Sequence, residues 1–445
     1  MHPGTALLDR VSHAAALSER GRVVLSGLSW TAVGQGVTVL VKLGSNLVLT
    51  RLLAPELFGL IGTALAVLAV LDLLSDMGLQ PAVIRHADGE SADVTSTAWW
   101  LGLARGGTLT AAACGLAIPA AAFYGEPPLA GLLIMMGLRP LLLALRSPAY
   151  PILRRQMNYR VLFVDEMAQM LLSTGTTLLL AVLTGSVWSI VAGVLTGALA
   201  SVFVSWRAVP RCVTRPRRAV AADLLRFSGP VFLNTLVMAA WLKLDSVLGL
   251  KLIGPDAFGL YVVALGLAGA AEAMVVRVCD VYFSAMSRVP AEQRDRWHAA
   301  QVARVTPLAG PLAAFSVVVA PFAVDVMYDQ RYRAVGGVLA ILLARLSLRA
   351  FGQFRFQHLL AQGRVRVATL GYGLALGVQI MMLVPLTSRL GVAGLAWAAL
   401  ASTAVVTLTQ ELCELRRGTS TLTHLAWCGL WTAAGLALTI PAASA

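Results

Sequence analysis

Long apolar stretches separated by short polar segments run through nearly the whole of this chain. Apolar residues make up 58% of the sequence and charged residues only 13%, a composition foreign to soluble globular proteins of this size. A helix needs roughly 20 mostly apolar residues to cross a bilayer. The expected spans are 25–50, 57–84, 96–123, 128–147, 160–184, 187–208, 229–251, 257–286, 303–326, 335–359, 366–388 and 391–413, with a thirteenth candidate at 423–443.

The stretches are continuously apolar, whereas the strands of a membrane β-barrel alternate polar and apolar residues. The fold class expected is therefore an all-α polytopic membrane protein with about 12–13 transmembrane helices. The first 24 residues carry arginines and lack the short apolar core and cleavage site of a signal peptide. The first apolar stretch is accordingly interpreted as a retained helix.

A ten-residue sequence occurs twice, at positions 200 apart. Residues 51–60 are RLLAPELFGL and residues 251–260 are KLIGPDAFGL, so a basic residue, proline, an acid, phenylalanine and glycine recur at matching places. Each copy ends one apolar stretch and begins the next. Many transporters consist of two such homologous halves, with the substrate path at their interface. The repeat therefore predicts two pseudo-symmetric six-helix bundles and favours a transport function.

The division expected from the repeat is as follows: a cytoplasmic N-terminal segment at 1–24, an N-terminal bundle at 25–208, a basic cytoplasmic linker at 209–228, a C-terminal bundle at 229–413, and a C-terminal segment with an extra helix at 414–445.

Basic residues are concentrated on one side of the predicted topology. With the N-terminus in the cytoplasm, 21 arginines fall in cytoplasmic segments and only five basic residues fall in outer loops, as the positive-inside rule requires. The net charge of +13 is thus a topology signal facing anionic lipid, and nucleic acid is not expected as a partner. The densest basic stretch, PRCVTRPRR at 210–218, is interpreted as a solvated linker in preference to a partner site.

Several cations fall inside the predicted spans, where charge is costly and usually functional. Arg345 and Arg349 are four residues apart and share one helix face, on a helix without an acid. They should face a wet cavity or acids on other helices. Arg146, Arg277 and Arg355 reach the inner interface, where snorkelling toward water is expected. The candidate substrate-binding cations are Arg345, Arg349, Arg139, Lys42, Lys243 and Arg105.

Fewer acids lie at membrane depth, namely Asp72, Asp245 and Glu272. The surplus of cations suits an anionic ligand such as a phosphate or pyrophosphate head group; the alternative is that these cations form interhelical salt bridges and nothing more. Asp72 and Glu272 are equivalent in the repeat. These two acids and Asp245 are candidates for coupling to a proton or sodium ion, or for pairing with the cations, and the sequence leaves both alternatives open.

The sequence gives little support for catalysis or for a metal site. The five cysteines are scattered, the histidines have no ligand spacing, and no Asp-x-Asp metal site occurs. The outer loops are too short for a catalytic domain. No catalytic residue, metal or cofactor is therefore expected, and the chain is not expected to be an enzyme.

Two segments resemble a known family. LTRLLAPELFGLIGTALAVLAVLDLLSDMGLQPAVIR at 49–85 and LDSVLGLKLIGPDAFGLY at 244–261 are similar to the oligosaccharide flippases of the polysaccharide-transporter branch of the MOP superfamily, which also holds the MATE transporters and the lipid II flippase. The resemblance implies a V-shaped pair of bundles and transfer of a prenyl-pyrophosphate-linked oligosaccharide between the leaflets of a bacterial cytoplasmic membrane. It implies a role in lipopolysaccharide, capsule or exopolysaccharide synthesis.

Rival interpretations remain. A MATE-type cation-coupled drug antiporter would share the fold, but the cationic cavity argues against a cationic drug. An integral-membrane glycosyltransferase or polymerase would usually need a large outer loop or a metal site. A scaffold of polysaccharide assembly would tolerate loss of the intramembrane arginines. The partners expected are the lipid-linked oligosaccharide, membrane lipids and, more loosely, a polysaccharide polymerase complex.

Overall fold

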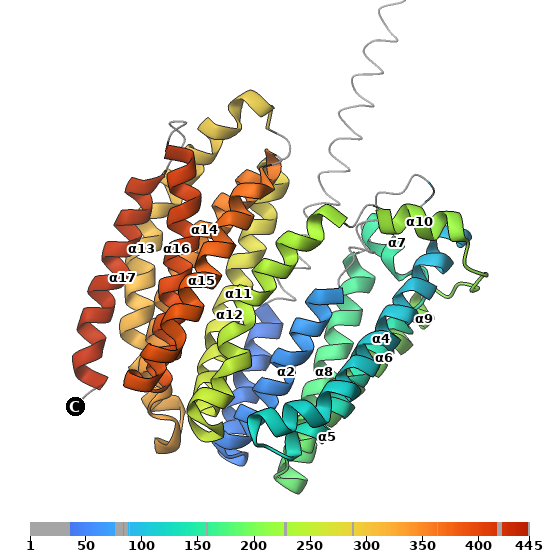
Figure 1. Cartoon of the computed structure of the whole chain (residues 1–445), viewed down its shortest axis with the longest axis horizontal. Coiled ribbons are helices and arrows are strands. Elements are labelled where there is room, and N and C mark those ends of the chain that lie inside the picture. Colours follow the sequence, from blue (N-terminus) through green and yellow to red (C-terminus); the bar gives the residue numbers. More distant parts are fainter. Residues whose placement is uncertain are drawn as a thin grey trace, which may run out of the picture.

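The structure is a computed structural model of the 445-residue chain (Figure 1). It describes residues 36–75, 83, 88, 90–156, 159–226, 229–286, 289–362, 364–415 and 421–443. All regular structure in these stretches is helical, which confirms the all-α polytopic class. The expected N-terminal segment at 1–24 lies outside the described residues.

The helices follow most of the expected spans, but the span expected at 128–147 is divided into two short helices at Gly137. In chain order they are residues 36–52, α2 (Pro55–Ser75), α4 (Ala92–Tyr124), α5 (Pro128–Met136), α6 (Leu138–Ala144), α7 (Tyr150–Arg155), α8 (Tyr159–Thr184), α9 (Trp188–Ala208), α10 (Arg218–Arg226), α11 (Gly229–Ile253), α12 (Pro255–Met286), η1 (Ala291–Gln293), α13 (Arg294–Met327), η2 (Gln330–Tyr332), α14 (Val335–Ala361), α15 (Val365–Leu390), α16 (Val392–Leu415) and α17 (Leu422–Ala443).

Helix length and composition suit a bilayer. Within the described ranges, eight helices are long and apolar enough to cross a membrane, and 55–71 and 128–144 are shorter apolar segments. Local signals set the boundaries. The side chain of Ser91 accepts a hydrogen bond from the Val94 amide at the start of α4, and Gly125 (φ +76°) ends that helix in the left-handed conformation.

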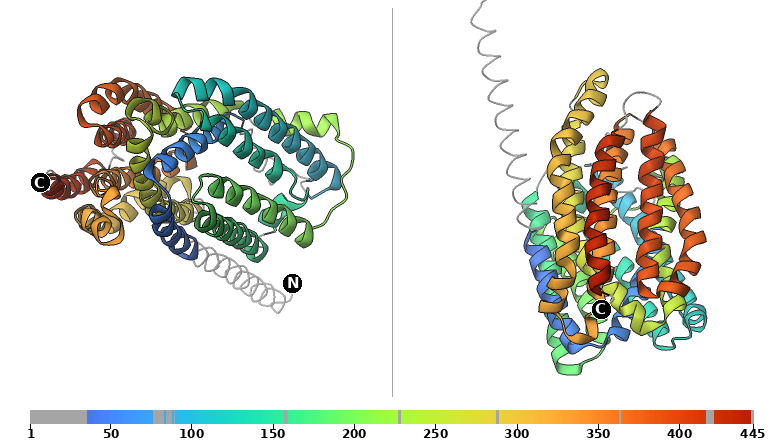
Figure 2. Two further views of the ribbon diagram at one scale, coloured as in Figure 1. Left: turned by 90° about the horizontal axis from the view of Figure 1, so that it is seen from below. Right: turned by 90° about the vertical axis from the view of Figure 1, so that its left-hand side faces the viewer.

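The helices form two groups that lie side by side (Figures 1 and 2). In the first group, α4 contacts α5 and α6, and α8 packs along α9. In the second, α11 packs on α15, α15 on α16, and α13 on both α14 and α17. The two groups meet mainly through α2, which contacts α11 and α12. This is the arrangement expected of two homologous halves.

The two copies of the repeat contact each other directly at this junction. A Cβ atom added to Gly259 would lie 1.7 Å from the carbonyl oxygen of Pro55, and one added to Gly59 would lie 2.3 Å from the carbonyl oxygen of Pro255. Each copy therefore places its proline carbonyl against the glycine of the other. Glycine is required at both positions because any side chain would occupy the space of a backbone atom.

We call the end of the molecule that holds residues 53–55 and 253–255 the repeat end, and the opposite end, which holds α10, the linker end. In Figure 1 the repeat end is at the bottom. Within the described residues, three hydrogen bonds join the two groups, and all lie toward the repeat end. The hydroxyls of Tyr124, Tyr328 and Tyr332 donate to the Val247 carbonyl at 2.6 Å, the Asn46 side-chain oxygen at 3.3 Å and the Leu53 carbonyl at 2.9 Å.

Burial raises the pKa of Tyr332 to about 12. Its hydroxyl therefore remains a donor to the Leu53 carbonyl even at about pH 10, where an ordinary tyrosine is half ionised.

At the linker end, the basic connection between the two groups is anchored to α4. The backbone amides of Thr214 and Arg217 donate to the Ser96 and Thr97 hydroxyls at 3.0 and 3.1 Å. The Arg217 guanidinium lies 2.9 Å from Asp93. The connection is thus fixed along the first turns of α4, although its arginine side chains remain largely solvent-exposed.

Candidate functional site

The most buried of the candidate cations is Arg345, in the middle of α14. Its side chain is only 7% exposed, and one terminal nitrogen lies 3.7 Å from the Asp245 carboxylate of α11. Its Nε donates to the Thr403 hydroxyl of α16 at 3.1 Å, and the guanidinium lies 5.9 Å from the centre of the Trp241 ring, within cation–π range. Its Nη2 has no hydrogen-bond partner among the described residues. Arg345 therefore retains unused donor capacity.

Asp245 is held in place by other donors. The Tyr261 hydroxyl donates to one carboxylate oxygen at 2.6 Å, and the Ser246 amide donates to the other at 2.8 Å. Because these neutral donors already satisfy the carboxylate, the longer contact to Arg345 is mainly electrostatic.

One helical turn further along α14, Arg349 forms a closer ion pair, 2.8 Å from Glu272 of α12. Here the side chains are 23% and 32% exposed, so this pair is more accessible than the Arg345 pair. A cavity of about 30 Å³ between α12 and α14 is lined by Glu272, Arg345 and Arg349. Both arginines therefore lie opposite acids on other helices, beside this small cavity.

The first group of helices holds a second polar centre. Arg146 lies 3.7 Å from Asp165 of α8, whose carboxylate also accepts hydrogen bonds from the Tyr150 and Ser201 hydroxyls, each at 2.6 Å. The sequence analysis did not identify Asp165 as a deep acid, although the residue lies inside the expected span 160–184. Asp165 lies six residues after the start of α8 and is 1% exposed.

The remaining candidates are distributed over both groups. Arg105 on α4 and Arg139 on α6 are half-buried, Lys243 on α11 is half-buried, and Lys42 on the 36–52 helix is exposed. The side chain of Asp72 lies outside the described residues. The structure thus brings together Arg345, Arg349, Asp245 and Glu272, but Arg105 and Arg139 belong to the other group of helices.

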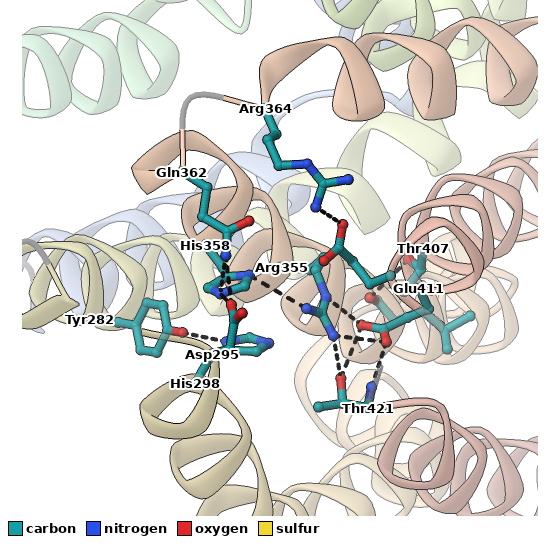
Figure 3. Close-up of polar contacts among 12 residues, drawn as sticks. Tyr282, Asp295, His298, Arg355, His358, Gln362, Arg364, Thr407, Glu411 and Thr421 are labelled. Carbon is teal, nitrogen blue, oxygen red and sulfur yellow. Dashed lines mark hydrogen bonds and ion pairs between the residues drawn. The ribbon is translucent and has the colours of Figure 1, made fainter. Parts of the chain in front are cut away.

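A further buried ion pair lies near the linker end of the second group (Figure 3). Arg355 is 1% exposed and binds Glu411 through two bonds, from Nε at 2.8 Å and from Nη2 at 2.9 Å. The Arg355 guanidinium also donates to Thr421, the residue before α17, at 3.0 Å. The expectation that Arg355 snorkels toward water is therefore wrong, because a carboxylate on α16 neutralises it inside the bundle.

Two histidines extend this cluster (Figure 3). His298 of α13 and His358 of α14 stack with ring centres 4.4 Å apart. His358 contacts Asp295 at 2.9 Å, and His298 contacts the Tyr282 hydroxyl. The arrangement joins α12, α13, α14, α16 and the start of α17, and we interpret it as a structural tie between these helices. In the described part of the chain, no group of three or more His, Cys, Asp or Glu side chains is placed to hold a metal ion.

Comparison with known proteins identifies the family. The sequence profile described as "Polysaccharide biosynthesis protein" matches residues 48–336. The chain belongs to this polysaccharide biosynthesis protein family. A curated relative, the succinoglycan biosynthesis transport protein ExoT of Rhizobium meliloti (strain 1021), is 30% identical over 210 residues, which are 46% of this chain and 42% of ExoT. The match therefore spans less than half of that relative's length.

Solved structures of the MOP superfamily share the fold of this family member. The lipid II flippase MurJ in an inward closed conformation is 11% identical, with a TM-score of 0.73 over 91% of both chains. An inward-facing multidrug resistance MATE transporter of the MOP superfamily is 16% identical, with a TM-score of 0.67 over 85% of this chain and 94% of that one. The expected MATE-like architecture is confirmed.

Proposed function

We propose that this protein is a flippase that transfers a prenyl-pyrophosphate-linked oligosaccharide across the bacterial cytoplasmic membrane during surface polysaccharide synthesis. Family membership and the transporter fold support the class of function. An anionic substrate is proposed because two arginines share one face of α14. Arg345 has a terminal nitrogen without a hydrogen-bond partner among the described residues, and the guanidinium of Arg349 is partly exposed.

The chemistry proposed is an exchange of ion-pair partners. A guanidinium donates two parallel hydrogen bonds to a phosphate as readily as to a carboxylate. A pyrophosphate entering between α12 and α14 would therefore compete with Glu272 for Arg349, while Arg345 offers its free Nη2. The lipid tail would stay in the bilayer during this exchange.

The proposed topology places the linker end in the cytoplasm and the repeat end outside. The reciprocal glycine contacts and the tyrosine hydrogen bonds then close the outer side. Rocking of the two halves about α2 and α12 would open the repeat end and close the linker end, as in alternating access.

A double substitution of the two arginines tests the proposal. In a strain lacking the protein, complementation with Arg345→Ala plus Arg349→Ala is expected to leave lipid-linked oligosaccharide on the cytoplasmic face. Each charged hydrogen bond lost costs about 1.5–3 kcal/mol, so the rate should fall at least tenfold. The measurement is the fraction of intermediate accessible to a membrane-impermeant reagent in spheroplasts.

Two controls sharpen this experiment. Arg389→Ala removes an exposed arginine at the end of α15 and should transport normally. Arg349→Ala alone spares the buried Asp245 pair and guards against a folding defect of the double variant. If the intermediate reaches the outer face normally without this protein, the flippase proposal fails, and drug efflux or a scaffold role has to be tested.

Glu272→Gln tests the exchange step. In the wild type, the Glu272 carboxylate lies 2.8 Å from the Arg349 guanidinium and would compete with an anionic substrate for it. The amide variant removes the competing negative charge, so it should bind an anion more tightly than the wild type. The check is pyrophosphate affinity of the purified protein by calorimetry; an unchanged or weaker affinity in Glu272→Gln would rule out this competition.

A further inference from the structure

The first group of helices contains a cavity of about 270 Å³ that the transport proposal does not use. It lies toward the linker end, between α4, α6 and residues 146–151. Its size approaches that of small-molecule sites in proteins. It is built on different helices from the Arg345 and Arg349 cluster, which is formed by α11, α12, α14 and α16.

Two glycines on α4 explain why the cavity exists. Gly106 lets α4 approach α6, because a Cβ atom there would lie 2.9 Å from the Pro140 carbonyl and 3.0 Å from the Ala144 side chain. Gly102 lies one turn earlier on the same face, and a Cβ atom there would meet nothing within 4 Å. The helices therefore touch at Gly106 and leave open space at Gly102.

The cavity is lined by two arginines, Arg105 and Arg146, and the described lining contains no acid. Arg146 lies beside Asp165, but that carboxylate already accepts short hydrogen bonds from the Tyr150 and Ser201 hydroxyls. The Nε of Arg146 is buried and has no hydrogen-bond partner among the described residues. The Arg146 side chain as a whole is 20% exposed and lines the cavity, so its positive charge faces a bound anion.

An aromatic wall completes the lining. The indole nitrogen of Trp99 donates to the Arg146 carbonyl at 2.8 Å, and its ring packs edge-on against Trp100, with ring centres 5.2 Å apart. These contacts fix the ring beside the arginines. A rigid aromatic surface next to guanidinium groups suits a ligand with both C–H faces and a negative charge.

We propose that this cavity binds an anionic head group about the size of one sugar ring, carrying a phosphate or a carboxylate on a polyol. Two sources share this chemistry: the glycerophosphate head of an anionic membrane lipid, which basic pockets between membrane helices bind, and an acidic sugar of a glycan. The site concerns binding alone and does not depend on the transport proposal.

Gly102→Leu tests the site by filling it, because the added side chain enters open space. Gly107→Leu is the matched control, since Gly107 is on the same helix, has nothing within 4 Å of an added Cβ atom and does not line the cavity. The full-length protein is purified into nanodiscs of phosphatidylglycerol or phosphatidylcholine, and retained lipid is counted by native mass spectrometry. Glucose 1-phosphate and glucuronate are titrated separately by calorimetry.

Retention of phosphatidylglycerol by the wild type and Gly107→Leu, but not by Gly102→Leu, would assign the site to a lipid head. Loss of glucose 1-phosphate or glucuronate affinity by at least tenfold in Gly102→Leu alone would assign it to a sugar. Arg146→Gln, which removes the charge without filling the space, should show the same loss. If Gly102→Leu and Arg146→Gln match the wild type both in lipid retention and in affinity for the two sugar derivatives, the proposal is overturned.

Discussion

Arg355→Met is expected to destabilise the protein by about 3–5 kcal/mol, the usual cost of leaving one partner of a buried ion pair uncompensated. Glu411 is 3% exposed and would lose both bonds to the guanidinium. Thr421, which precedes α17, would lose its bond from Arg355 as well. Thermal or chemical unfolding of the detergent-solubilised protein measures the change.

A second substitution separates charge from packing. Arg355→Met combined with Glu411→Leu replaces the pair with apolar side chains and should recover most of the stability, because such replacements of buried pairs are often neutral or stabilising. Arg389→Met, at an exposed position, should unfold like the wild type. A single variant as stable as the wild type would show that the pair is dispensable.

Gly259→Ala is expected to open the repeat end. The added Cβ atom would lie 1.7 Å from the Pro55 carbonyl oxygen, so α2 and α12 have to separate. Overpacking of this kind costs typically 1–3 kcal/mol, which shifts a two-state equilibrium by about 5- to 150-fold. The state closed at the repeat end should lose that much population, and transport should fall with it.

Spin labels provide the measurement. Glu56 and Asp256 are exposed, equivalent residues in the first turns of α2 and α12, and cysteines there report the separation of the two halves by electron–electron double resonance. Gly373→Ala on α15 is the control, since an added Cβ atom there meets nothing within 4 Å and the residue does not line the cavity beside Arg345 and Arg349. An unchanged distance distribution in Gly259→Ala would contradict a closure made by these glycines.

The fold was largely predictable from hydrophobicity because each bilayer-spanning helix needs its own apolar stretch. The expected span at 96–123 became α4 (Ala92–Tyr124), and 423–443 became α17 (Leu422–Ala443). The span expected at 303–326 begins earlier, at Arg294. The first turn of this helix is charged, and a hydrophobicity criterion leaves such a turn out of the span. The repeat predicted two halves, but not that its own two copies touch.

The site was less predictable because it depends on which helices are neighbours. The spacing of Arg345 and Arg349 placed them on one face, but their acids lie about 100 and 77 residues away in sequence, on α11 and α12. The histidines lacked ligand spacing, yet His298 and His358, sixty positions apart, stack in the structure. Asp165 and Glu411 were overlooked for the same reason, since burial of an acid near a helix end is set by tertiary contacts.

The reciprocal contact between the two repeats has a kinetic consequence. At Gly59 and Gly259 the surfaces that meet are main chain on both sides, with no side chain inserted between them. At these two points the halves can part and re-form without any side chain leaving its rotamer. The rate at which the two halves separate should then be set by the side chains around the junction, such as Phe58 packed against Tyr332, by the tyrosine hydrogen bonds there, and by the movement of whole helices through lipid.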